Sequence, residues 1–281
     1  MHLQLTATAL SLAFLVGAPM MTLSAQQQAS PSVSQQGIRV EPDTGAPATP
    51  PSTIRRRPVF TSRDFLIGAA FMTAVTVLIP ADGQIAREFQ RPAVQTSAAL
   101  RGTAHGAEMI ASPGALIFGG SFYAVGLIAR KRAPADMGWH TLEAMAVSGQ
   151  VTSLLKGLFG RSRPYASGGD ARDFDLGGGF ASATRRSFPS GHTSMAFTFA
   201  SVVDEETSHR WPRAHRVIAP LAYVAATSVG LARMYNDKHW ASDIALGAAI
   251  GTLSGKLVVR YAHGRPGNFI DRVALRGMAL R

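Results

Sequence analysis

The sequence predicts an all-α domain of about six helices, embedded in a membrane. Six apolar segments follow one another between residues 65 and 259, and each is bounded by proline, glycine or charged residues. None shows the strict alternation of apolar and polar residues that is typical of a half-buried strand. Small residues recur within the segments, as in Gly119-Gly120 and residues 247–251, and small residues let helix backbones approach closely.

The first element is an apolar stretch, residues 1–25, with the composition of a secretory signal peptide. Its apolar centre spans residues 10–16, and small residues follow before a glutamine-rich run begins at Gln26. The residues that precede the apolar centre include His2 but neither Lys nor Arg. A signal peptide usually begins with positive charge, so a short N-terminal membrane anchor is the alternative.

The second element is a linker, which we place at residues 26–60. From Gln26 to Ser52 the chain is rich in Gln, Ser, Pro, Thr and Gly and has almost no large apolar residues. Such a composition cannot form a core, so we expect a disordered tether. The helical domain is predicted to follow at residues 61–275.

The six apolar segments of that domain are short for membrane helices. They are residues 65–79, 115–129, 141–159, 193–203, 217–232 and 244–259, of which the third is the weakest. Most are nearer 15 residues than the ~20 that a hydrocarbon core of about 30 Å requires. Buried helices of a soluble protein are therefore the alternative.

Clusters of arginine favour the membrane. If all six helices cross, the basic groups at residues 55–57, 130–132, 210–216 and 260–265 fall on one side. Basic loops mark the cytoplasmic face, so we expect a bacterial-type inner membrane protein whose functional segments face the periplasm. A cleaved signal peptide would instead place those segments in the cytoplasm after six crossings. The two signals conflict, and a soluble periplasmic form after signal cleavage is the alternative.

Composition narrows the classes of function. The 281 residues are 46% apolar, and 28 Lys and Arg against 17 Asp and Glu give a net charge of +11. Such a charge suits anionic partners. Nucleic acid is disfavoured because the basic residues alternate with long apolar segments instead of forming a stripe with exposed aromatics. The chain has no cysteine, which excludes a phosphatase that attacks phosphorus with a thiolate.

Metal-dependent hydrolysis is also disfavoured. Such enzymes need clustered Asp, Glu and His ligands, and no H-x-x-x-H pattern or paired-carboxylate cluster occurs within a predicted helix. We therefore expect neither a metal nor a cofactor, and a mechanism based on histidine.

Three short segments place cations and imidazoles at spacings suited to a phosphate. They are KGLFGRSRP at residues 156–164, PSGH at 189–192 and ARMYNDKHWASD at 232–243. This order resembles the type 2 phosphatidic acid phosphatase (PAP2) family, whose motifs read K-x6-RP, PSGH and SR-x5-H-x3-D. Each piece alone is weak, but three in order with intact spacings are hard to obtain by chance. The resemblance implies a helical bundle of the PAP2 type.

The resemblance implies that His239 is the nucleophile. A neutral imidazole can attack phosphorus and form a phosphohistidine, provided that its other nitrogen is held by an acceptor. Asp243 lies four residues on and would share a helix face with His239 if the segment is helical. Taken alone, such a His-Asp pair more often only stitches a helix surface.

The same resemblance assigns His192 as the general acid. An ordinary histidine pKa of about 6.5 lets the side chain give and take a proton near neutrality. Ser190 is a plausible helix N-cap, and Gly191 shapes the turn, so that free N–H groups at the helix start would face the anion. An isolated PSGH would more simply be an ordinary cap with a solvated histidine.

Three cations are expected to hold the phosphoryl oxygens, namely Lys156, Arg163 and Arg233. Fixed cations stabilise the charge that gathers on phosphoryl oxygens, and arginine can donate two parallel hydrogen bonds. On a chain this basic, a solvated face is the plainer explanation for any one of them. Possible secondary contacts are Arg161, Arg185, Arg186 and Lys238.

Some residues near or outside the motifs carry weaker expectations. Ala232 stands where the family has serine, so phosphate could bind less tightly or Ser190 could replace the lost contact. Trp240 could wall the pocket or simply pack. Five further histidines match no motif and are expected at the surface or in loops: His105, His140, His209, His215 and His263.

The sequence therefore predicts a metal-independent phosphatase that hydrolyses a phosphate monoester or diphosphate through a phosphohistidine. The apolar helices favour a phosphorylated lipid over a small phosphate ester as substrate. A vanadium-dependent haloperoxidase is one alternative, because that branch of the superfamily binds vanadate with a similar set of residues. A membrane protein that binds anionic lipid without catalysis is another.

Overall fold

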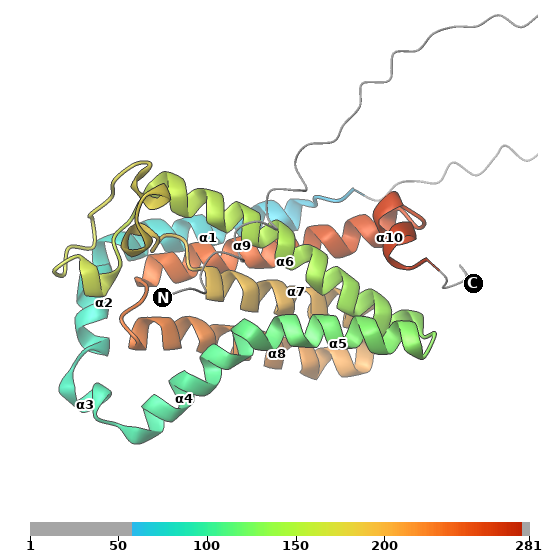
Figure 1. Cartoon of the computed structure of the whole chain (residues 1–281), viewed down its shortest axis with the longest axis horizontal. Helices are drawn as coiled ribbons and strands as arrows, with labels where there is room; N and C mark the ends of the chain where they lie inside the picture. Colours follow the sequence, from blue (N-terminus) through green and yellow to red (C-terminus); the bar gives the residue numbers. More distant parts are fainter. Residues whose placement is uncertain (1–57, 277–281) are drawn as a thin grey trace, which may run out of the picture. The chain divides into compact units, whose positions relative to one another are not determined.

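The computed structural model describes residues 58–276, and these are helical (Figure 1). Within them no strand occurs, and a single bridge joins Arg161 to Phe174. The predicted all-α class is confirmed. The predicted signal peptide and nearly all of the predicted linker lie outside the described residues.

The six predicted helices are present. They are α1 (Ser62–Leu78), α5 (Ala115–Ile128), α6 (Arg132–Phe159), α7 (Gly191–Arg210), α8 (Pro212–Tyr235) and α9 (Ala241–Gly264). Both α6 and α7 extend beyond their apolar segments into charged sequence. These extensions hold each other, because Nη2 of Arg210 lies 2.6 Å from Oδ2 of Asp136. An apolar pattern alone could not predict that part.

Further helices lie between α1 and α5 and after α9. They are the 3-10 turn η1 (Ile79–Ala81), α2 (Asp82–Phe89), α3 (Pro92–Gln95), α4 (Ala98–Met109), the π-helix η2 (Ile110–Gly114) and α10 (Phe269–Ala274). None contains a long apolar run, so the sequence did not indicate them. Helices α2 and α3 lie at one end of the bundle and α10 at the other (Figure 1).

Helix α7 forms the centre of the bundle and packs against α6, α8 and α9. Its approach to α9 is close because α9 presents glycines there. A Cβ at Gly247 would lie 2.5 Å from the carbonyl oxygen of Ser190, and one at Gly251 would lie 2.2 Å from that of Ser194. The role predicted for the small residues of segment 247–251 is confirmed.

The helix directions bring the three motifs to one end of the bundle. Helices α6 and α8 end there, whereas α7 and α9 begin there. We call this the site end. It carries arginines of its own on α2, α4 and the turn between α2 and α3, namely Arg87, Arg101 and Arg91. The difference in charge between the two ends is therefore smaller than the four basic clusters of the sequence suggest.

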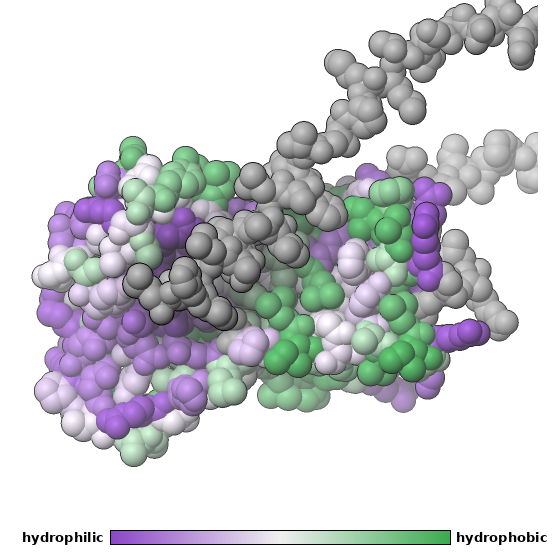
Figure 2. Space-filling model, in the orientation of Figure 1, coloured by the Kyte–Doolittle hydropathy of each residue, from purple (hydrophilic) through white to green (hydrophobic). Residues whose placement is uncertain are grey.

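Much of the surface between the ends is apolar. Three helical stretches in the described part of the chain are long and apolar enough to cross a membrane: Ser62–Phe89, Pro212–Tyr235 and Ala241–Gly264. Figure 2 shows hydrophobic residues gathered on the visible face toward the α10 end, and hydrophilic residues over the site end. Exposed apolar side chains include Phe65, Leu66, Val77, Ile117, Val125, Leu221 and Val224.

Candidate active site

The three motifs meet at the site end. Lys156 lies in the last turn of α6, Arg233 in the last turn of α8, and His239 in the loop before α9. The charges of Lys156, Arg163 and Arg233 all act on the ring of His192, and those of Lys156 and Arg163 act on the ring of His239. Residues that are far apart in sequence thus surround one small region.

His239 and Asp243 form a buried pair. Nδ1 of His239 lies 3.4 Å from Oδ2 of Asp243, and the two residues are 3% and 0% exposed. Burial lowers the pKa of His239 to about 3, so the imidazole is neutral near pH 7. A neutral ring is the form that can act as a nucleophile.

The reason for this contact differs from the predicted one. His239 does not share a helix face with Asp243, because α9 begins only at Ala241. Instead Asp243 stands in the first turn and accepts a hydrogen bond of 2.9 Å from the backbone N–H of Trp240, the N-cap residue. That bond turns the carboxylate back toward the preceding loop, where the histidine lies.

A buried arginine, Arg161, holds the carboxylate of Asp243 in place. Nη1 of Arg161 lies 2.7 Å from Oδ1 of Asp243, and Nη2 lies 2.7 Å from Oδ2 of Asp82 on α2. The hydroxyl of Ser187 donates a further bond of 2.5 Å to Asp243. Because Arg161 is fully buried among these partners, it does not serve as the secondary phosphate contact that the sequence suggested.

The last turn of α6 and the loop that follows it carry the first motif's cations. Nζ of Lys156 donates to the carbonyl oxygens of Arg186 and Ser187, at 2.6 and 3.2 Å. Nη1 of Arg163 donates to that of Lys238 at 3.2 Å. Backbone carbonyls thus fix both side chains, and no carboxylate of the described residues forms an ion pair with either one. Burial lowers the pKa of Lys156 to about 7, and a bound phosphate would favour its charged form.

Three predicted secondary contacts have other partners. Arg185 pairs with Asp173 at 3.1 Å. Arg186 donates to the carbonyl of Gly179 at 2.9 Å, and Nζ of Lys238 lies 4.6 Å from the ring centroid of Tyr165. These contacts hold the loop in shape.

The start of α7 has the predicted cap. Oγ of Ser190 accepts a hydrogen bond from the hydroxyl of Thr193 at 2.9 Å, and the backbone N–H of Ser190 donates to the carbonyl of Asp243 at 2.9 Å. A Cβ at Gly191 would lie 3.6 Å from Cε of Lys156, so this glycine faces the cations. The hydroxyl of Ser190 is fully buried and already engaged, which leaves it poorly suited to replace a lost phosphate contact.

Sequence reasoning missed an acid at the site. Glu108 on α4 forms an ion pair with Nη1 of Arg233, and its charge also lies near His192. Nε of Arg233 is buried and has no hydrogen-bond partner among the described residues. The guanidinium therefore keeps a free donor. No sequence signal pointed to Glu108, because α4 itself lacks an apolar run.

Ala232 does not lie beside the cations in the way its motif position suggests. It is 3% exposed and packs with Ala104 and Ala107 of α4 and with Tyr235. It also lines an apolar pocket of about 230 Å³ between α2, α4 and α8. Trp240 packs in the interior, where its ring N–H donates to the carbonyl of Ser162 at 3.0 Å.

The expectation for the remaining histidines is wrong for His140. This residue lies within α6, is 2% exposed and bonds to Glu206 of α7. The sequence could not reveal this, because its partners come from other helices at the end of the bundle opposite the motifs.

Known proteins are similar to the part of the chain that carries the three motifs. Residues 138–266 match the model of the PAP2 superfamily, and this range includes every residue of the three motifs. This part of the chain, a little under half of its length, is similar to the PAP2 superfamily. The resemblance read from the motifs is thereby confirmed.

Two known proteins are similar to parts of this chain. A lipid A 1-phosphatase of Porphyromonas gingivalis is 34% identical over 113 residues, which are 40% of this chain and 21% of the relative. The chain thus matches about a fifth of that protein's length. The crystal structure of a transmembrane PAP2 type phosphatidylglycerolphosphate phosphatase from Bacillus subtilis is similar in fold, with a TM-score of 0.50 and 20% identity over 72% of this chain and 94% of that one.

Proposed function

We propose that this protein is a metal-independent phosphatase that hydrolyses a phosphate monoester or diphosphate of a lipid through a phosphohistidine. The observation that carries the proposal is the buried His239–Asp243 pair, with a 3.4 Å contact, close to the first motif's cations Lys156 and Arg163. The steps below follow from that arrangement.

His239 is the nucleophile. Because Nδ1 faces Asp243, Nε2 is the nitrogen that attacks phosphorus. The P–N bond forms while the bond from phosphorus to the leaving oxygen breaks. The ring becomes positively charged at that moment, and the carboxylate of Asp243 stabilises it. Asp243 does not need to accept the proton.

His192 transfers the protons. In its protonated form it gives a proton to the departing lipid oxygen, and the resulting neutral ring then takes a proton from the water that hydrolyses the phosphohistidine. Its position in the first turn of α7, near both Arg233 and Glu108, suits this role. Burial and the positive charges of Arg233, Lys156 and Arg163 lower the pKa of His192 to about 4, and the negative charge of Glu108 partly opposes this shift. The negative charge of a bound phosphate would favour the protonated form further.

Lys156, Arg163 and Arg233 hold the phosphoryl oxygens. Fixed cations are most effective where water is excluded, because they need no rearrangement as charge develops on the phosphate. Arg233 is 8% exposed and retains the free Nε–H described above. The first turn of α7 adds backbone N–H groups at Gly191.

The acids of the site support a reaction without a metal ion. Asp243 already accepts hydrogen bonds from Arg161, Ser187 and Trp240. Glu108 is paired with Arg233. Each carboxylate is committed to a protein cation, and a cation cage can bind phosphate directly.

Two observations favour a lipid as the substrate. Apolar side chains are exposed along α1, α5 and α8, which suits contact with acyl chains. The apolar pocket is lined by Ala232, the residue that directly precedes Arg233, and this pocket could receive part of an acyl chain. The relative from Porphyromonas gingivalis is named for a lipid phosphatase activity, which agrees with this class.

We also propose that the site faces the periplasm of a bacterial-type inner membrane. The support is the exposed basic group at Arg130 and Lys131, together with Arg213 and Arg216, at the end of the bundle opposite the site. Reactivity of a cysteine introduced beside Arg213 toward a reagent that cannot cross membranes tests the orientation, and labelling from the periplasm would contradict it.

Phosphate release tests the proposed activity. Purified full-length protein in detergent is assayed with phosphatidate, phosphatidylglycerophosphate and lipid A, with and without a chelator. We expect release that is unaffected by the chelator and that falls by at least about 10³-fold in His239→Ala. The matched control, His105→Ala, alters an exposed histidine of α4 and should retain the wild-type rate. Lipid binding without release, or full activity in His239→Ala, contradicts the proposal.

A further inference from the structure

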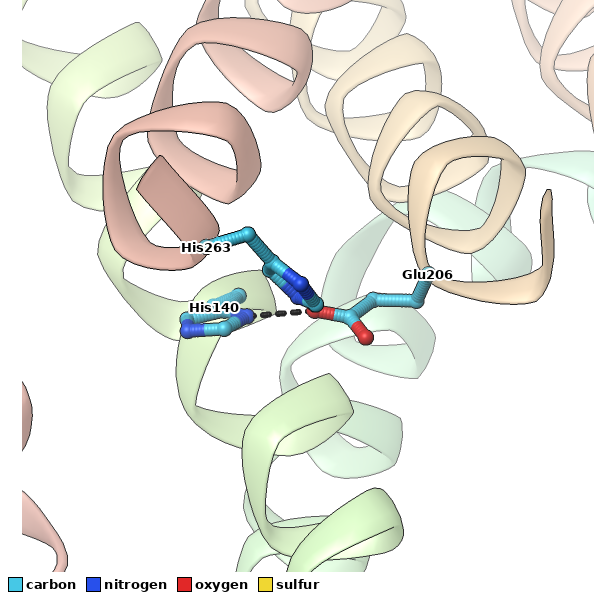
Figure 3. A group of neighbouring side chains, drawn as sticks. All are labelled: His140, Glu206 and His263. Atoms are coloured by element: carbon cyan, nitrogen blue, oxygen red, sulfur yellow. Dashed lines mark hydrogen bonds and ion pairs between the residues drawn. The ribbon is translucent and has the colours of Figure 1, made fainter. Parts of the chain in front are cut away.

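A second histidine cluster lies at the end of the bundle opposite the phosphatase site. His140 of α6, Glu206 of α7 and His263 of α9 point toward one another from three helices (Figure 3). One ligand atom from each lies within 4.8 Å of the others. None of these residues belongs to a PAP2 motif.

The donor atoms converge on one carboxylate oxygen. Nδ1 of His140 lies 2.5 Å and Nε2 of His263 lies 3.0 Å from Oε1 of Glu206. His140 and Glu206 are 2% and 0% exposed, whereas His263 lies at the surface. The other carboxylate oxygen, Oε2, accepts a bond of 3.0 Å from Nε of Arg210, which fixes the orientation of the group.

The second ring nitrogen of His140, Nε2, faces the carboxylate of Asp271. Nε2 of His140 is buried and has no hydrogen-bond partner among the described residues, and neither has Oδ1 of Asp271, which lies 3.7 Å away. If Nδ1 binds a metal, Nε2 must carry the proton, and this N–H then faces the carboxylate. A carboxylate behind a metal-binding imidazole is the usual way to fix its tautomer.

The surrounding charges also suit a cation. Asp136, Glu206 and Asp271 give three negative charges, whereas Arg132 and Arg210 give two positive charges, so the group has a net charge of −1 when its histidines are neutral. A divalent ion would offset this charge.

A cavity beside the cluster gives a metal ion room and a path from the surface. A cavity of about 390 Å³ adjoins the cluster, and it is lined by His140, His209, His263, Asp271 and Pro266 among others. It offers a path for an ion and room for a water molecule in a fourth coordination position. The surface position of His263 lets its side chain adjust to coordination distances of about 2.0 to 2.2 Å.

We propose that Nδ1 of His140, Nε2 of His263 and Oε1 of Glu206 bind one divalent transition-metal ion, for which Zn²⁺ is the best match. Two imidazole nitrogens and one carboxylate oxygen form a set that zinc accepts in tetrahedral geometry with a water molecule. The ion would join α6, α7 and α9 at the end remote from the phosphatase chemistry. This proposal does not depend on the proposed function.

Zinc binding by the purified full-length protein, without a histidine tag, provides the test. After exposure to Zn²⁺ and dialysis, we expect one zinc ion per chain, and a higher melting temperature with zinc than after chelation. His263→Ala should bind zinc at least about 10- to 100-fold more weakly and lose the thermal shift. This variant changes a surface residue, and Glu206→Gln provides a second, buried test.

A second histidine variant serves as the control for zinc binding. His105→Ala removes an exposed histidine of α4 and should bind zinc as the wild type does. Absence of stoichiometric zinc in the wild type, or equal affinity in His263→Ala and the wild type, overturns the proposal. Phosphate release by His263→Ala at low temperature should equal that of the wild type, whereas failure of the proposed phosphatase function would leave zinc binding unchanged.

Discussion

Arg161 is the residue on which the geometry of the site depends. It is fully buried, and its two Nη atoms join Asp243, beside the proposed nucleophile His239, to Asp82 on α2. A buried guanidinium needs such partners, because an unpaired buried charge is strongly destabilising. The arginine stabilises the charged form of Asp243 and holds it in place, so that the carboxylate of Asp243 can orient His239.

Substitution of Arg161 should therefore reduce both stability and activity. A lysine has one charged nitrogen and cannot hold two carboxylates with the same fork. We expect Arg161→Lys to lower the free energy of unfolding by about 3 to 5 kcal/mol, as when a buried pair is broken. Arg185→Lys is the matched control, since its pair with Asp173 is partly exposed, and should change it by less than about 1 kcal/mol. Equal effects in thermal melts of the two variants would contradict the role of Arg161.

The sequence named the residues of the candidate site but not the residues that support them. The motif residues could be named because their spacing within each segment is distinctive. The roles of Asp82, Glu108 and Arg161 could not, because each depends on a partner from a remote helix. Ala232 shows a different limit, since its neighbours on α4 determine which way its side chain packs.

Among the elements, the loop from α6 to α7 depends most on a single turn. Helix α6 ends at Phe159, and the next residue, Gly160, caps it in the left-handed region with a φ of 55°. A Cβ at Gly160 would lie 1.8 Å from the carbonyl oxygen of Asp175. The turn sends the chain directly into Arg161. Both the backbone conformation and the close approach thus require glycine.

We predict that Gly160→Ala disrupts this loop. The steric clash adds to the ordinary cost of a left-handed alanine, which is about 1 to 2 kcal/mol. Gly168→Ala is a matched control, because Gly168 has a φ of 63° but open space around its Cα. Chemical denaturation should show a clearly larger loss for Gly160→Ala, accompanied by loss of phosphate release. Similar losses in the two variants would show that the clash is relieved.

Element prediction succeeded where apolar runs are long. Helices α1 and α5 match their predicted segments closely, whereas α8 and α9 contain their predicted segments and are each eight residues longer. Helices α2, α3 and α4 gave no such pattern. They are positioned by tertiary contacts instead, as when the side-chain amides of Gln90 and Gln95 donate to the carbonyl oxygen of Tyr235 at 3.2 and 2.9 Å.

The helical bundle formed by residues 58–276 has two polar ends and an apolar surface between them. Long apolar helices with exposed Phe65, Leu221 and Val224 suit contact with lipid. The central helix α7 does not need an apolar sequence, because its polar residues are satisfied inside the bundle: the hydroxyl of Thr198, for example, donates to the carbonyl of Ser194 at 2.8 Å. This explains why apolar length alone gave an ambiguous prediction between a membrane protein and a soluble one.

Fractionation of cells that express the protein tests the membrane prediction. We expect the protein in the membrane pellet after washing with alkaline carbonate, because its apolar surface is buried in lipid and not held by charge. Sequencing of the N-terminus of the same material shows whether a signal peptide is removed. Release into the carbonate supernatant would favour the soluble form.

The phosphohistidine is the central claim, and trapping it is the most direct test. Purified protein is mixed with a lipid substrate labelled with ³²P in its terminal phosphate and quenched in base within milliseconds. The account predicts a label that is stable to base, labile to acid and located on the peptide that contains His239, and that is absent in His239→Ala. A base-stable, acid-labile label on the peptide that contains His192, or full turnover with no labelled protein at any quench time, would contradict it.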